Sequence, residues 1–170
     1  MKEYGDAQGW PHEGGPLFLH PDDDLAPNRP GEALHARLAA LGVPHHPRLA
    51  ACARALGRLA GRPDERAALR RALDGEQRAG EELERLTGGG WRVLHSVPVP
   101  PAAAVPHLLI GPGGVFTLHT ACPRGARVRV GTDAVLVARG RAEPWVRLSR
   151  REARHAALAL SRGCGFPVTV

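Results

Sequence analysis

The segment HLLIGPGGVF, residues 107–116, decides how the C-terminal part of this chain folds. It joins two apolar runs, Val105–Ile110 and Val115–Thr120, and both have the composition that favours strands. Between them, Gly111–Gly114 supplies glycines, which adopt the backbone angles of tight turns without steric cost. The lysine and the following helix of a phosphate-binding loop are missing here, so the segment predicts a β-hairpin.

Outward from this hairpin, the pattern of apolar residues predicts the other C-terminal elements. Trp91–Val97 is expected to form a preceding strand, and Arg127–Val130 with Ala134–Ala138 a second hairpin. A helix is predicted from about 147 to 161, and Phe166–Val170 is predicted to be one more strand. The expected buried stripe of the helix consists of Ala153, Ala156, Ala157 and Leu160.

The N-terminal half is predicted to be helical. Leucines fall on one face over residues 34–41, and apolar residues recur at helical spacing over residues 49–59. A third helix is predicted from about residue 65 to residue 86, because Asp64 stands where an N-cap belongs and Gly88–Gly90 follows as a stop signal.

The order of elements predicts an α/β fold in which a mixed β-sheet is flanked by helices and preceded by a helical leader. Residues 1–30 are rich in turn-forming residues and are expected to be a flexible tail. The leader is expected to cover residues 31–73, and the α/β domain residues 74–170.

Composition restricts the classes of protein that remain. The chain has 170 residues and a formal net charge of +6, which favours anionic partners, and its only lysine is Lys2. The cysteines number 3 and lie far apart without C-x-x-C spacing, which argues against a disulfide scaffold and a zinc site. No apolar run approaches the roughly 20 residues of a membrane span. The start lacks the apolar region of a signal peptide, so a cytoplasmic location without a membrane partner is expected.

Three motifs carry a resemblance to a known family: Gly75–Arg78, Gly90–His95 and, most specifically, residues 107–116. With these motifs, Asp74–Val170 resembles the nuclease-related domain (NERD) family of the PD-(D/E)xK nuclease superfamily. The resemblance implies a restriction-endonuclease-like core. It also implies that active members hold Mg²⁺ with carboxylates on neighbouring strands, because this cation prefers oxygen ligands. In those members the lysine of an acidic-x-Lys motif offsets negative charge that develops on the phosphate.

Carried over onto this chain, the catalytic pattern fails. The first acid falls on Pro106, the second acid on His119 and the lysine on Ala121, which leaves Glu76 as the retained acid. Proline and alanine cannot ligate a metal, so the resemblance implies a pseudoenzyme without a metal or other cofactor. Glu76 and His119 remain as candidate catalytic residues. Glu76 has an equally good structural interpretation if the helix breaks at the preceding glycine, because a carboxylate stabilises a helix N-terminus. Pro106 is expected to remove a ladder hydrogen bond from its strand.

Arginines near the C-terminus favour nucleic acid as the partner. They recur at helical spacing and would share much of one face, on which phosphates could bind. The alternative is the ordinary polar face of an amphipathic helix. Trp145 lies close by in sequence, either to stack on a base or to serve as a partly buried anchor. The arginines of this predicted face are Arg147, Arg150, Arg151 and Arg154.

Three functional hypotheses therefore remain open. The first is a catalytically defective domain that binds DNA or RNA through the arginine-rich helix. The second is an active nuclease with a rearranged site that uses Glu76, His119 and a transition metal. The third is a protein-interaction module. The sequence does not distinguish DNA from RNA, and it does not indicate an oligomeric state.

Overall fold

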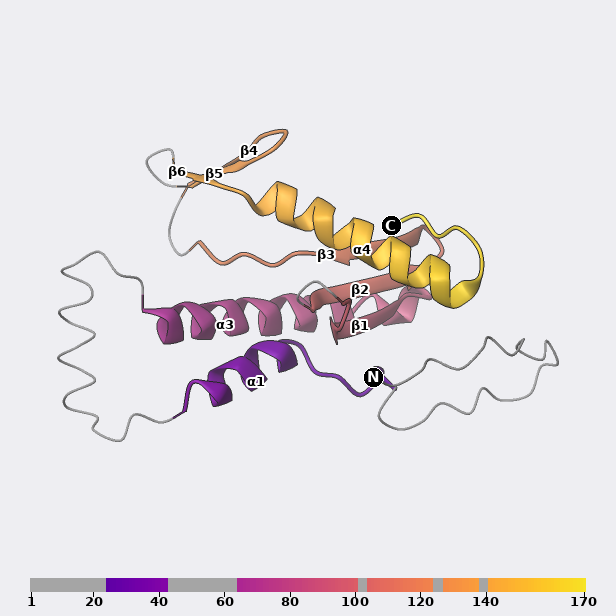
Figure 1. Cartoon of the computed structure of the whole chain (residues 1–170), viewed down its shortest axis with the longest axis horizontal. Coiled ribbons are helices and arrows are strands. Elements are labelled where there is room, and N and C mark those ends of the chain that lie inside the picture. The colour runs from indigo at the N-terminus through magenta and orange to yellow at the C-terminus, as the bar shows by residue number, and fades with distance from the viewer. Residues whose placement is uncertain (1–23, 43–63, 101–103, 124–126, 138–140) are drawn as a thin grey trace, which may run out of the picture.

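The computed structural model describes residues 24–42, 64–100, 104–123, 127–137 and 141–170 (Figure 1). Within these ranges the fold is α/β with a helical leader, as predicted. The helix predicted over residues 49–59 lies outside the described residues. The elements are α1 (Glu32–Ala40), α3 (Glu65–Glu84), a 3-10 turn (Thr87–Gly89), β1 (Arg92–Val97), β2 (Val105–Gly111), β3 (Gly114–Leu118), β4 (Val128–Val130), β5 (Val135–Val137), β6 (Arg141–Glu143) and α4 (Trp145–Cys164).

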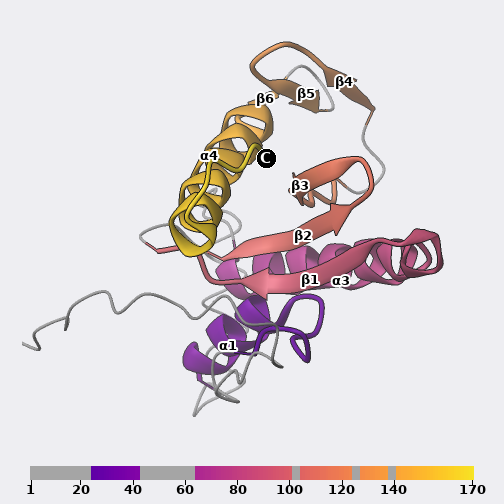
Figure 2. The ribbon, with the colours of Figure 1, turned by 90° about the vertical axis from the view of Figure 1, so that its right-hand side faces the viewer.

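The main sheet has the order β1-β2-β3, and its strands are antiparallel throughout. The quoted segment forms the predicted hairpin, in which Gly111 pairs with Gly114. Figure 2 shows this sheet between α4 on one side and α3 with α1 on the other. On the α4 side, the apolar core consists of Val97, Val99, Val105, Leu108 and Ala156. Burial of these side chains holds α4 against the sheet.

A second sheet, with the order β4-β5-β6, contains the second predicted hairpin. The strand β6 was not predicted. The described strands thus form two antiparallel sheets, where the sequence predicted one mixed sheet.

The strand predicted over Phe166–Val170 is wrong, because this segment follows α4 without joining either sheet. Gly165 ends the helix with a φ of 74°, and the chain then turns back. The backbone N–H of Val168 donates to Ser161 Oγ at 2.8 Å, and Val170 packs against the core. The segment is therefore held by contacts with α4 and the core, and not by pairing with another strand.

Helix α3 runs without a break through both of its glycines. Asp64 caps its N-terminus as predicted, by accepting a hydrogen bond from the backbone N–H of Ala67 at 3.1 Å. A side chain at Gly80 would overlap Pro30, and one at Gly75 would lie 3.2 Å from Cys122 Cβ. These glycines therefore allow close approach of neighbouring segments. Glu76 consequently lies inside the helix, and its interpretation as a helix-opening acid is wrong.

The N-terminal leader is packed onto the domain. Leu25, within the predicted tail, contacts the apolar core, and α1 packs on α3. The ladder between β1 and β2 omits the opposing pair Ser96 and Pro106, as the missing N–H of proline leads one to expect. Ser96 has a φ of 49°, and its Oγ accepts a hydrogen bond from the backbone N–H of Ala33 at 3.3 Å. The interrupted ladder thus becomes an attachment point for α1.

Candidate functional site

The two candidate catalytic residues come together, and a glutamate that the sequence analysis did not select joins them. Glu76 projects from α3, His119 directly follows β3, and Glu152 lies on α4. His119 Nδ1 lies 3.1 Å from both carboxylate oxygens of Glu152, and their side chains are 20% and 17% exposed. Glu76 and His119 are close enough for each charge to alter the pKa of the other. We call these three residues the acid–imidazole cluster.

Burial and the neighbouring charges shift the pKa values of Glu76 and His119. Glu76 is buried, and burial raises its pKa to about 7, while the nearby Glu152 carboxylate acts in the same direction and His119 acts against it. The hydrogen bond to Glu152 raises the pKa of His119, and the negative charges of both glutamates add to this, although burial opposes it. At neutral pH the Glu76 carboxyl is therefore partly protonated, and it lies next to an imidazole whose positive form is favoured by its hydrogen bond to Glu152.

These residues do not fit the Mg²⁺ centre of an active nuclease. Among the described residues, no group of three or more His, Cys, Asp or Glu side chains is placed to hold a metal ion. Pro106, at the position of the first acid, is buried in β2 and offers no ligand, and Ala121 stands in place of the lysine. No hydrolytic step through Mg²⁺ follows from this arrangement.

A buried histidine pair links α3 to the sheet. His95 Nδ1 and His107 Nδ1 are 2.8 Å apart, and His95 Nε2 lies 3.1 Å from Glu84 Oε1. A carboxylate only accepts, so His95 Nε2 donates to Glu84 and His107 Nδ1 then donates to His95 Nδ1. Burial, and secondarily His95, lowers the pKa of His107 to about 4, which keeps it neutral. His107 Nε2 has no partner among the described residues. This arrangement assigns His107 a structural role.

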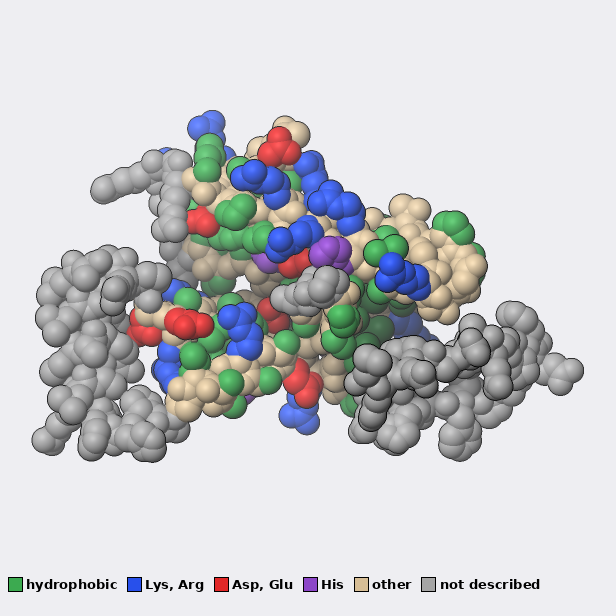
Figure 3. All heavy atoms as spheres, in the orientation of Figure 1, with side chains coloured by type: hydrophobic (Ala, Val, Ile, Leu, Met, Phe, Trp, Pro, Cys, Tyr) green, Lys and Arg blue, Asp and Glu red, His purple; other side chains and the backbone are tan. Residues whose placement is uncertain are grey.

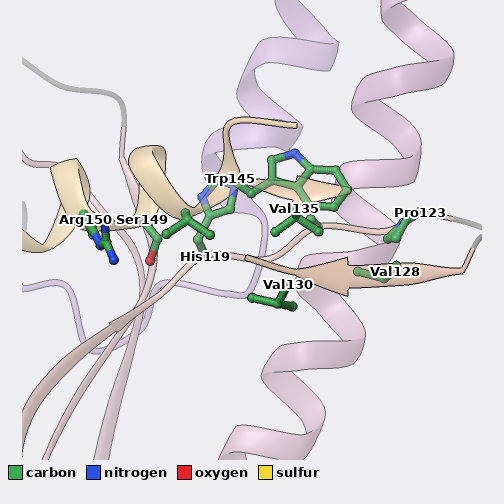
Figure 4. A pocket seen from close by; sticks show the side chains of 10 residues that line it. His119, Pro123, Val128, Val130, Val135, Trp145, Ser149 and Arg150 are labelled. Atoms are coloured by element: carbon green, nitrogen blue, oxygen red, sulfur yellow. The ribbon is translucent and has the colours of Figure 1, made fainter. Parts of the chain in front are cut away.

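A pocket of about 540 Å³ opens beside the acid–imidazole cluster (Figure 4). His119 belongs to both the pocket and the cluster. Figure 4 shows the indole of Trp145, the first residue of α4, beside Val135 of the second sheet. Most of the lining is apolar, and the polar side chains are His119 and two residues of α4. The lining residues are His119, Ala121, Pro123, Val128, Val130, Val135, Trp145, Val146, Ser149 and Arg150.

The arginines predicted to share a face lie on α4, and all of them are exposed. Figure 3 shows Lys and Arg side chains spread over the upper part of the molecule, where α4 lies in Figure 1. Arg150 Nη1 lies 3.0 Å from Asp133 Oδ1, and both side chains are more than half exposed. Such a pair contributes little to stability, so Arg150 can exchange partners. We call Arg147, Arg150, Arg151 and Arg154 the arginine face.

No helix within the described part of the chain is long and apolar enough to cross a membrane. The chain matches no curated protein and no solved structure. A family model described as "Nuclease-related domain" matches residues 71–158, which is just over half of the chain and begins three residues before the boundary predicted at Asp74. The match contains most of α3, all the described strands and most of α4, and it therefore includes the acid–imidazole cluster and the arginine face. The chain belongs to the nuclease-related domain (NERD) family.

Proposed function

We propose that this NERD domain binds nucleic acid through the arginine face of α4 and does not hydrolyse it. The observation that carries the proposal is the exposure of every arginine of that face along one helix. Phosphates bind such a face because guanidinium groups stay charged and form paired hydrogen bonds with oxyanions. The only acid on α4, Glu152, is turned inward and paired with His119, so it does not oppose phosphates at the surface.

The loss of hydrolysis is inferred from the acid–imidazole cluster. Residues 106 and 121 lack the functional groups that the family mechanism needs, and His119 is held in an ion pair with Glu152. Arginines cannot replace the missing lysine as a general base, because they do not lose their proton. A cytoplasmic location, as expected from the sequence, is part of the same proposal.

Binding can be tested by fluorescence anisotropy with labelled single-stranded and duplex DNA and RNA over a range of salt concentrations. The test protein carries alanine at the residues of the arginine face other than Arg150. The control carries the same change of net charge on α3, where the substituted arginines are also exposed. The test substitutions are Arg147→Ala, Arg151→Ala and Arg154→Ala. The control substitutions are Arg70→Ala, Arg71→Ala and Arg78→Ala.

We expect the α4 variant to bind more weakly. For duplex DNA, the slope of log K against log salt concentration should become shallower by up to about 2.7, because each lost phosphate contact removes about 0.9 from that slope. The α3 variant should bind like the unmodified protein. Equal losses in the two variants would mean that net charge, and not the arginine face, drives binding. Binding that salt does not weaken would favour the protein-interaction hypothesis.

The rearranged-nuclease hypothesis is favoured by one observation, the proximity of Glu76 and His119. The same oligonucleotides should therefore be incubated with EDTA, Mg²⁺ or Mn²⁺ and examined on gels. We expect no cleavage under any condition. Metal-dependent cleavage that disappears in both Glu76→Ala and His119→Ala would overturn the proposal and establish the rearranged site.

A further inference from the structure

The pocket beside the acid–imidazole cluster has the size and lining of a site for one planar apolar group. Its volume of about 540 Å³ lies within the range of roughly 300–1,000 Å³ typical of small-ligand pockets. It is bounded by β4 and β5, by the chain that follows β3, and by the first turns of α4. A nucleobase with its sugar fits such a volume, whereas a paired and stacked base must first leave its duplex.

The apolar wall of this pocket is open to solvent. Val130 is 77% exposed and Val128 is 44% exposed, although both line the pocket. Exposed apolar side chains gathered at a concave surface are typical of a site that a ligand covers. Trp145, half-buried at the edge, presents an indole to the same space. This wall therefore suits an aromatic ligand.

Two of the polar side chains that line the pocket, Ser149 and Arg150, lie on α4 and suit an anion. Arg150 lines this pocket and also a second hollow of about 420 Å³, which contains Arg154 one helical turn further along α4. A ligand with an aromatic ring in the pocket would have a negative group at Arg150 and a second one within reach of Arg154. An aromatic ring joined to repeated negative charges is the chemistry of a nucleic-acid strand.

We propose that the pocket takes an unpaired base, with the adjoining phosphate on Arg150, so that single-stranded nucleic acid is the preferred ligand of this domain. The inference rests on the proposed function and refines it, because duplexes keep their bases stacked and out of reach. Arg150 must then exchange Asp133 for a phosphate, which is possible because that ion pair is exposed.

The test compares three labelled DNA ligands of equal length at moderate salt: oligothymidylate, an abasic strand with the same phosphates, and a duplex. We expect oligothymidylate to bind at least about fivefold more tightly than the abasic strand, as stacking of one base typically gives. We also expect it to quench Trp145 fluorescence, identified by comparison with Trp145→Phe, and the abasic strand not to do so.

Two surface variants give results that do not depend on Trp145. Val130→Ser changes a side chain that is 77% exposed, so the fold should be retained. The ratio of the affinities for oligothymidylate and for the abasic strand should become smaller in this variant. Asp133→Asn releases Arg150 and should strengthen binding of both strands, whereas an unchanged or weaker affinity would contradict a phosphate at Arg150.

The possible failures are distinguishable. If none of the three ligands binds, and the RNA strands of the anisotropy experiment do not bind either, the proposed function itself is rejected. If the abasic strand binds as tightly as oligothymidylate, or the duplex binds more tightly than either, nucleic-acid binding stands and the base pocket is overturned.

Discussion

Glu76→Gln should make the stability of this domain less dependent on pH. Glu76 is 8% exposed in the middle of α3, and its pKa is raised from 4.5 to about 7, chiefly by burial. The folded state therefore holds the carboxyl proton more tightly than the unfolded state does. The stabilisation is fully present below pH 4.5 and is lost as the pH rises through 7. Glutamine resembles the protonated carboxyl group and remains neutral, so the variant should avoid this loss.

The magnitude follows from the size of the pKa shift. One pKa unit corresponds to about 1.4 kcal/mol, so the shift of Glu76 corresponds to roughly 3 kcal/mol of unfolding free energy between pH 4.5 and pH 8. This value already includes the opposing attraction to His119, which lowers the pKa of Glu76. His107 also contributes in the acid part of this range, because it takes up a proton in the unfolded state and stays neutral in the folded state, but this contribution is present in both proteins and cancels in their difference.

The assay is urea unfolding followed by circular dichroism, at pH values from 4.5 to 8. The free energy of Glu76→Gln minus that of the unmodified protein should rise by roughly 3 kcal/mol across the series. Glu81→Gln, at an exposed position of the same helix, is the matched control and should give a profile parallel to that of the unmodified protein. If Glu76→Gln also gives a parallel profile, the carboxyl group does not titrate as a buried acid, and the description of the cluster is wrong.

The remaining predictions concern the ion pair and the helix packing. Removing the negative charge with Glu152→Gln should lower the pKa of His119, because the hydrogen bond to that carboxylate is the main cause of its elevation. This is checked by an NMR titration of the His119 ring, whose signals are assigned by comparison with His119→Gln. An unchanged pKa of His119 would contradict the pairing. Gly80→Ala should destabilise the domain by about 1 kcal/mol or more, although alanine normally favours helix interiors by about that amount, because its Cβ would overlap the leader. Gly88→Ala meets nothing within 4 Å and serves as the control, and thermal unfolding that shows Gly80→Ala to be the more stable variant would refute the packing.

Local patterns in the sequence predicted those elements whose formation depends on neighbouring residues. The segment at residues 107–116 contains both strands and their turn, and the cap at Asp64 lies next to the helix that it begins. Phe166–Val170 has a strand-like composition too, but a strand also needs a partner. Here Val168 is hydrogen-bonded to Ser161 of α4, and Val170 packs against the core. The order of apolar residues along the chain does not tell which of these partners the segment contacts.

In the candidate site, too, features of single positions could be predicted from the sequence, and a contact between residues far apart in the chain could not. The absence of the family's acids and lysine was visible at Pro106 and Ala121 without a structure. The role of Glu152 was not visible, because it is 33 residues from His119 in sequence and stands among arginines. In the sequence, Glu152 stands out only as one acid within a strongly basic helix. Such an acid is ordinarily interpreted as an exposed surface charge.

Position 119 brings a group that can carry positive charge to two neighbouring carboxyl groups. Carboxyl groups from two helices, Glu76 of α3 and Glu152 of α4, come close to one another beside His119, and the charge of Glu152 adds to the rise in the pKa of Glu76 that burial causes. In a metal-dependent relative the positive charge that offsets such carboxylates is the ion, because a bound cation is the largest local charge in its site. Here the imidazole of His119, whose pKa is raised by its hydrogen bond to Glu152, can take up positive charge from within the chain, and partial protonation of Glu76 removes part of the negative charge. The cluster can therefore act as a fixed junction between the helices, while the arginine face of α4 lies exposed at the surface.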